Sequence, residues 1–218
     1  MNTPDAIRDL LHSENFGDRL RGINQLRDLD PAIGFELIQV PVTDSNVRVR
    51  YAAVSQLASL GRQDLETALS LLKTALADVE PDVQAAAADS IGALKLTQVY
   101  EELETLYHQT PEWLVSFSVI AALGELGDPR SFDLLKEALN GDNDLVKTAA
   151  IGSLGELGDV RAVELLIPYA TNPDWQIRYR VVQALGRLNT PEARSTIATL
   201  VQDETEQVAK EAREFLAA

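Results

Sequence analysis

The sequence repeats itself with a period of about 31 residues. The clearest copies are DNDLVKTAAIGSLGELGDVRAVELLIPYA, which begins at Asp142, and PEWLVSFSVIAALGELGDPRSFDLLKEALN, which begins at Pro111. The copies share one apolar anchor position, which is occupied by Leu26, Leu57, Ile91, Leu123, Leu154, Leu185 and Leu216. A repeat of this length is typical of chains that stack short structural units, so it constrains the fold more than any local motif does.

Each copy carries the pattern of two helices joined by a short turn. In the first helix, apolar residues recur at steps of three and four, as in Val49, Ala53, Leu57 and Leu60. A Gly-Asp pair then follows, such as Gly158-Asp159, in which glycine ends one helix and aspartate begins the next. A hairpin this small cannot bury its apolar face alone, so the copies must stack. The sequence therefore predicts an all-α fold, a right-handed α-solenoid of about seven helical hairpins.

The whole chain, residues 1–218, is expected to form a single solenoid domain. Residues 1–43 are interpreted as an N-terminal repeat with a capping helix, in which Thr3 is the N-cap and Pro4 the first helical residue. The more polar residues 202–218 are interpreted as a C-terminal capping helix. Pro168 lies inside a helical pattern and is expected to kink or shorten that helix.

Composition removes several classes of function. The formal net charge of −15 argues against nonspecific binding to nucleic acid or to anionic membranes. Cysteine is absent and the two histidines, His12 and His108, are isolated, which argues against a metal site. No apolar stretch is long enough to cross a bilayer, so we expect a cytoplasmic protein without membrane insertion. No nucleophile constellation or phosphate-binding loop is visible, and catalytic residues remain unknown.

Paired aromatic residues mark the first helix of several copies. Trp113 is followed four residues later by Phe117, Trp175 is followed by Tyr179, and Tyr51 occupies the position of Phe117 in an earlier copy. Helical geometry places this position at the border of the core stripe. These side chains either pack against the adjoining repeat or line the concave face as flat apolar shelves, which suit a protein partner or a conjugated ligand.

Basic residues are concentrated on the same helices. One interpretation is a ladder between repeats, in which a cation beside the core valine pairs with an aspartate of a neighbouring turn such as Asp128 or Asp159. This interpretation is favoured for Arg50, Lys147 and Arg178. The other is recognition of ligand carboxylates, for which arginine has the matching geometry and for which Arg48 and Arg180 are the better candidates.

Asp89 stands alone in an alanine-rich helix, where it is either simply solvated or able to accept hydrogen bonds from N–H groups of a ligand. The predicted binding residues on the concave face are therefore Trp113, Phe117, Trp175, Tyr179, Tyr51, Arg48, Arg50, Arg178, Arg180 and Asp89.

The repeat unit resembles that of a known family. LVKTAAIGSLGELGDVRAVELL and NVRVRYAAVSQLASLG are similar to the short HEAT-like repeat of the phycobilisome bilin lyases. FGDRLRGINQLRDLDPAIGFELIQ, DVQAAAADSIGALKL, EWLVSFSVIAALGELGDPR and PDWQIRYRVVQALGRL extend the resemblance over essentially the whole chain. They resemble in particular the lyase-related members that act in cyanobacterial phycobilisome degradation.

This resemblance implies a role in dismantling phycobilisomes during nutrient starvation, in the cytoplasm and at the thylakoid through the phycobilisome. The implied partners are phycobiliproteins, with phycocyanin first and allophycocyanin second. The implied ligand is phycocyanobilin, bound without being an intrinsic cofactor, and the implied action is to assist its detachment. A bilin would stack on the aromatic side chains and direct its two propionates to the arginines.

Two alternatives remain open on sequence alone. One is a bilin lyase, or a lyase partner, that attaches phycocyanobilin to an apo-phycobiliprotein. The other is a non-catalytic protein-interaction scaffold, because a HEAT-like repeat by itself defines the fold and little of the function. Whether the protein is an enzyme is therefore undecided at this stage.

Overall fold

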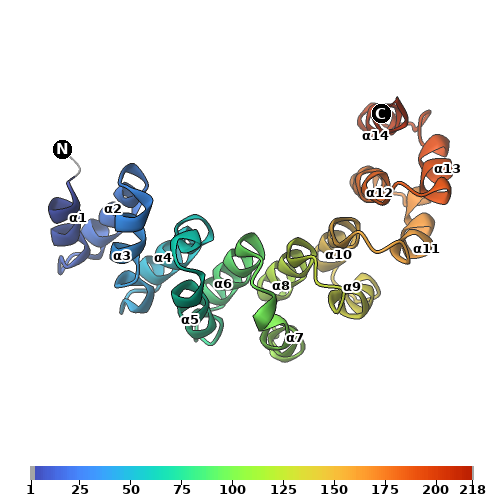
Figure 1. Cartoon of the computed structure of the whole chain (residues 1–218). Helices are drawn as coiled ribbons and strands as arrows, with labels where there is room; N and C mark the ends of the chain where they lie inside the picture. The colour runs from blue at the N-terminus through green and yellow to red at the C-terminus, as the bar shows by residue number, and fades with distance from the viewer. Residues whose placement is uncertain (1–2, 218) are drawn as a thin grey trace. The chain divides into compact units, whose positions relative to one another are not determined.

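The computed structural model describes residues 3–217, and within that range it contains fourteen α-helices and no β-strand (Figure 1). The helices alternate between two types along the chain, as the repeat requires. The prediction of an all-α solenoid is therefore confirmed. Met1, Asn2 and Ala218, which the predicted domain limits include, lie outside the described residues.

The first-type helices recur once in every copy and carry the anchor residues, except Leu26, which directly follows the first of them. They are α2 (Phe16–Gln25), α4 (Val47–Leu60), α6 (Pro81–Leu94), α8 (Trp113–Leu126), α10 (Asp144–Leu157), α12 (Trp175–Leu188) and α14 (Glu206–Ala217).

The second-type helices are mostly shorter. They are α1 (Pro4–Leu11), α3 (Pro31–Ile38), α5 (Leu65–Leu76), α7 (Tyr100–Gln109), α9 (Ser131–Leu139), α11 (Ala162–Leu166) and α13 (Pro191–Thr199). Short 3₁₀ helices occupy several connections, namely Leu26–Asp28, Pro41–Thr43, Gly61–Gln63, Thr97–Val99 and Ile167–Thr171.

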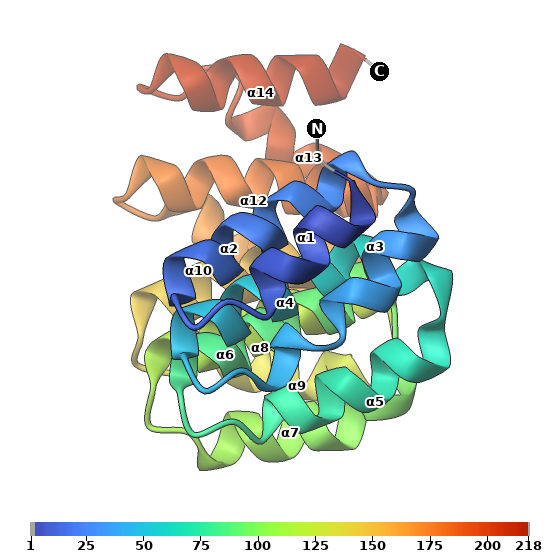
Figure 2. The same cartoon turned by 90° about the vertical axis from the view of Figure 1, so that its left-hand side faces the viewer.

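The chain divides into two compact units, residues 1–122 and 123–218, and the division falls within α8. In unit 1, α2, α4 and α6 pack side by side, and α3 and α5 pack against α4 and α6. In unit 2, α10, α12 and α14 form the corresponding row, with α9 against α10 and α13 against α12. Figure 2 shows α12 and α14 running alongside each other. The expectation of a single domain stays a prediction.

The helix ends follow the signals in the sequence. Thr3 accepts a hydrogen bond from the Ala6 N–H at 3.3 Å and Pro4 is the first residue of α1, as predicted. Gly127 and Gly158 adopt positive φ angles of 65° and 74°, the left-handed conformation that glycine tolerates best. Pro168 lies near the start of the 3₁₀ helix Ile167–Thr171, which directly follows the five-residue α11, because proline cannot donate the next helical hydrogen bond.

The anchor positions form the core along the row of first-type helices. Six of the seven anchor residues are completely buried, and Leu216 in the terminal helix is half-buried. The helices also approach closely at small residues. A Cβ built on Gly155 would lie 2.6 Å from the Ala184 Cα, and one built on Gly124 would lie 2.6 Å from the Ser153 Cα. The spacing between α10 and its neighbour α12 therefore depends on a missing side chain.

A ladder of ion pairs, one buried and one half-buried, ties successive repeats together. The Arg50 Nε donates to Asp78 at 2.7 Å, and the Arg178 Nε donates to Asp203 at the same distance. Each guanidinium also donates a hydrogen bond to a backbone carbonyl just before its own helix. For Arg50 the acceptor is the Asp44 carbonyl oxygen, at 2.9 Å. The predicted ladder is confirmed for these two arginines, although their partners are not the aspartates that the sequence suggested.

The ladder prediction was wrong for Lys147 and for the two turn aspartates. Lys147 pairs with Asp144 in the first turn of its own helix, at 3.3 Å. Asp128 is held by Arg130, and Asp159 is held by Arg161, which lies two residues further along the chain in the same turn. Because each arginine is only two residues from its aspartate, the pair forms without the entropic cost of closing a long loop. These two carboxylates are therefore not available to a neighbouring repeat.

One buried polar atom is left without a partner in the described part of the chain. The Ser131 Oγ is fully buried and makes no hydrogen bond, whereas the equivalent position of the next repeat is Ala162, also fully buried. We expect Ser131→Ala to raise the free energy of unfolding by about 1 kcal/mol, because it removes an unsatisfied hydroxyl. Urea denaturation would measure the change. The reciprocal Ala162→Ser should lower the stability, and an unchanged or less stable Ser131→Ala variant would contradict this account.

Candidate functional site

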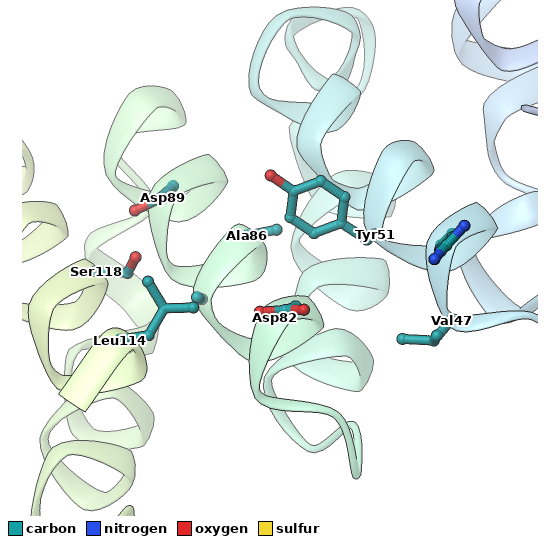
Figure 3. A pocket seen from close by; sticks show the side chains of 9 residues that line it. Val47, Tyr51, Asp82, Ala86, Asp89, Leu114 and Ser118 are labelled. Carbon is teal, nitrogen blue, oxygen red and sulfur yellow. The ribbon is translucent and has the colours of Figure 1, made fainter. Parts of the chain in front are cut away.

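A pocket of about 370 Å³ opens across three first-type helices of unit 1 (Figure 3). Its volume lies in the range of small-molecule sites. Helices α4, α6 and α8 line it with Val47, Arg48, Tyr51, Asp82, Ala85, Ala86, Asp89, Leu114 and Ser118. The pocket is therefore lined by first-type helices, which are the helices on which the sequence analysis placed the predicted binding residues.

One lining residue of the pocket is small where the two flanking first-type helices carry an aromatic ring. Ala85 on α6 occupies the repeat position that Tyr51 holds on α4 and Phe117 holds on α8. A methyl group in place of a ring leaves space between the flanking helices, and Ala86 beside it adds little volume. Alignment of the copies shows an alanine where the two flanking helices have an aromatic ring, so this difference could have been found in the sequence.

Arg48 supplies the positive charge of the pocket. Its side chain is exposed, and no ion pair within residues 3–217 involves it. Arg50, two residues further along α4, is turned toward the next repeat and committed to Asp78. The structure thus separates a structural arginine from one that is available to a ligand carboxylate.

Tyr51 supplies the aromatic surface. It lies three residues after Arg48 on α4, so both side chains share one face of the helix. The Tyr51 side chain is 48% exposed, and Figure 3 shows its ring beside α6. A flat ligand could therefore stack on this ring with an acidic group near Arg48.

Asp89 lies in the pocket on α6, with Ser118 of α8 as its hydrogen-bond partner (Figure 3). Its carboxylate is reachable from solvent through the mouth of the pocket, but the surrounding helices still desolvate it. This desolvation raises the pKa of Asp89, while the hydrogen bond from the Ser118 hydroxyl opposes the rise. Asp89 has no cationic partner in the ion pairs of the described chain.

The structure brings together three of the predicted site residues, Arg48, Tyr51 and Asp89. Trp113 begins α8 next to the lining residue Leu114 and is 48% exposed, so it is not buried between repeats. Phe117 is half-buried and does not line the pocket. The border position predicted for the aromatic residues agrees with these degrees of burial.

The remaining predicted residues lie in unit 2 and are described separately. Trp175 is 40% exposed at the start of α12, and Arg180 is exposed on the same helix. Tyr179 is half-buried, and its hydroxyl lies 3.1 Å from Glu211 on α14, so this residue helps to hold the terminal helix. Burial, followed by the Glu211 carboxylate, raises the pKa of Tyr179. Arg178 is buried against Asp203.

Asp82 is the main pocket residue that the sequence analysis missed. It lies two helical turns before Asp89 on α6, a spacing that places both carboxylates on one face. Leu114 and Ser118 on α8 are related by the same kind of spacing, one turn apart. Nothing in their residue types separates them from ordinary border positions, so only the packing of α6 beside α8 reveals them.

Two other features of the described residues bear on chemistry. Residues 3–217 contain no group of three or more His, Asp or Glu side chains placed to hold a metal ion. None of the helices in this range is both long enough and apolar enough to cross a membrane. What the pocket offers is an arginine, two carboxylates, a hydroxyl and an aromatic ring on an apolar floor.

The stacked helical hairpins define an α-helical repeat protein. The family model described as HEAT repeats matches residues 69–155 and 139–217, together more than half of the chain. The chain therefore belongs to the HEAT-repeat family. No match is found among curated protein sequences.

Solved structures show the same fold. The complex of CpcE and CpcF of phycocyanin lyase from Nostoc sp. PCC7120 superposes with a TM-score of 0.67 at 20% identity, covering 99% of this chain and 94% of that chain. YibA of E. coli superposes with a TM-score of 0.68 at 16% identity, covering 98% of this chain and 81% of that chain. These superpositions show a shared HEAT-repeat fold, which is also the fold of a phycocyanin lyase complex, and they do not by themselves define a function.

Proposed function

We propose that this protein is a phycobilisome degradation factor that binds phycobiliproteins and their phycocyanobilin and assists detachment of the chromophore. The observation that carries the proposal is the pocket of unit 1, where Arg48, Tyr51 and Asp89 converge. The resemblance of the repeats to those of bilin lyases, and the fold shared with a phycocyanin lyase complex, support the same class of ligand.

The chemistry of a bilin matches the groups in the pocket. A bilin is a flat conjugated tetrapyrrole with two propionates and several N–H groups. Its ring system would stack on Tyr51, a propionate would pair with Arg48, and its N–H groups would face Asp89. Apolar contacts from Ala86 and Leu114 would cover the remaining edge.

Assistance by binding needs no catalytic group in this protein. A factor that binds a displaced bilin more tightly than the attached one shifts the equilibrium toward the displaced state. Phycocyanin is the first partner to test and allophycocyanin is the second. In this proposal the protein acts in the cytoplasm and reaches the thylakoid surface only as part of a phycobilisome.

Size-exclusion chromatography of the protein mixed with intact phycocyanin would test the proposal, with protein and bilin absorbance followed separately. We expect bilin to move into the peak of this protein, or holo-phycocyanin to shift as a complex. Ala85→Phe should reduce that transfer or shift by about tenfold or more, because it places an aromatic ring in the pocket and fills it.

Arg27→Ala is the matched control, since Arg27 is exposed outside the pocket and should leave binding unchanged. Helical circular dichroism of each variant would show that the fold is intact. No shift and no transfer with the wild-type protein would contradict the proposal and leave an interaction scaffold for other partners. Transfer of free bilin onto apo-phycocyanin would contradict detachment and indicate a lyase instead.

A further inference from the structure

We infer that Asp89 is the specificity-determining residue of the unit 1 pocket. Its ionised carboxylate accepts hydrogen bonds from ligand N–H groups, so ligand binding is coupled to release of a proton from the protein. The inference rests on the proposed function, because it takes a bilin as the ligand that carries these N–H groups.

The repeat itself does not require a carboxylate at this position. The equivalent position is Ser55 on α4, Ala121 on α8 and Gln183 on α12. Asp78, in contrast, serves the ladder and pairs with an arginine of another repeat. Asp89 has only the Ser118 hydroxyl to offset its desolvation, so it does not contribute to the ladder that joins the repeats.

The pocket changes the pKa of Asp89 but, among the described residues, provides no cation that forms an ion pair with it. Helix α4 brings Arg48 and Tyr51 to the pocket, α6 itself brings Asp82, and the α8 lining residues carry no charge. Burial raises the pKa of Asp89, and the Ser118 hydrogen bond limits that rise. Although Asp89 is exposed at the mouth of the pocket, its carboxyl in the free protein therefore stays protonated to a somewhat higher pH than that of an aspartate in an unfolded chain.

Ligand binding should reverse this effect. N–H donors placed against the carboxylate favour its ionised form and lower its pKa, which releases a proton from any molecule that was protonated. Affinity should consequently fall as the pH drops through the pKa of Asp89 in the free protein, because the proton then competes with the ligand. The limiting slope is about tenfold in affinity per pH unit.

The Asp89 carboxyl should also lower the stability of the folded protein at neutral pH. A carboxyl whose pKa is raised on folding disfavours the native state once the pH exceeds that pKa. Asp89→Asn removes the charge at nearly constant shape and should raise Tm at neutral pH while weakening binding. A residue that only supported the fold would not move these two measurements in opposite directions.

The test is absorbance titration of the wild-type protein, Asp89→Asn and Asp82→Asn with phycocyanobilin, from the ordinary pKa of an aspartate, about 4, up to about pH 8. The ligand's own propionates titrate identically in all three series. We expect Asp89→Asn to bind about tenfold more weakly at the upper pH and to lack the pH-dependent step of the wild type. Asp82→Asn, the matched carboxylate of the same helix and pocket, should keep that step.

Calorimetry in two buffers of different ionisation enthalpy would count the released protons directly. Proton release by the wild type and its loss in Asp89→Asn support the inference. Bilin binding with the same pH profile in both proteins would overturn it while leaving the proposed function standing. Absence of bilin binding by the wild type at every pH would overturn the proposed function, and this inference with it.

Discussion

Replacement of Arg178 by methionine is expected to lower the free energy of unfolding by about 3–5 kcal/mol. The Arg178 and Asp203 side chains are only 7% and 5% exposed, and the guanidinium contacts both carboxylate oxygens at 2.7 and 2.8 Å. It also donates to the Asn172 carbonyl at 2.8 Å. Methionine fills much of the same space, but it leaves the Asp203 carboxylate buried without its cation.

Urea denaturation would measure this loss, and Arg187→Met is the control. Arg187 pairs with Glu156 at 3.2 Å on the surface, where an exposed ion pair contributes about 1 kcal/mol or less. Equal effects of the two substitutions would contradict the view that the ladder holds the repeats together. A variant too unstable to titrate would still be distinguished from the control by its Tm.

The pH dependence of the Arg178→Met effect follows from the sign of one pKa shift. The hydrogen bond from Arg178 lowers the pKa of Asp203, so the carboxylate stabilises the folded state above its unfolded pKa of about 3.9. That contribution is lost as the pH falls through the lower folded pKa. The difference in stability between wild type and Arg178→Met should therefore shrink below about pH 4.

Gly155→Val is expected to lower the free energy of unfolding by about 3 kcal/mol. A Cβ at this position would lie 2.6 Å from the Ala184 Cα and 2.8 Å from its Cβ, so α10 and α12 would have to move apart. The contacted atoms belong to the backbone of α12 and to the Ala184 Cβ, and they cannot move aside as the end of a flexible side chain can. Thermal and urea denaturation would both report the change.

Gly152→Ala is the matched control on the same helix. A Cβ at Gly152 would meet nothing within 4 Å, so alanine there should raise stability by up to about 1 kcal/mol through its better helix propensity. If Gly155→Val were as stable as the wild type, the close approach of the two helices would not be a packing constraint.

Much of the fold was predictable because the repeat appears several times in one chain. The copies share the apolar spacing and an apolar anchor, so a weak local signal is reinforced by its recurrence. The glycine stop is found in only some of them, because Lys95 and Asn189 end α6 and α12. The ladder was predicted only in part. Whether a cation reaches a neighbouring repeat or a local carboxylate depends on the path of each turn, as the separate fates of Arg50 and Lys147 show.

The candidate site was less predictable, for a geometric reason. Arg48, Tyr51 and Asp89 were recognised by residue type, and Arg48 was preferred to Arg50 as a ligand-binding residue, but the sequence did not separate Tyr51 from Phe117. The distinction arises from the direction in which each side chain leaves its helix and from what the next helix brings against it. Trp113 and Trp175 lie exposed in separate units, and their roles as binding residues stay predictions.

The sequence by itself determined the stacking of helical hairpins, since a 31-residue period with one apolar stripe leaves no other way to bury that stripe. It also determined where helices end, because capping residues and glycines act locally. Only the tertiary structure decided which carboxylate each structural cation pairs with, and where a pocket opens. Those properties depend on residues about 30 positions apart or more, brought together on α4, α6 and α8 by packing between repeats.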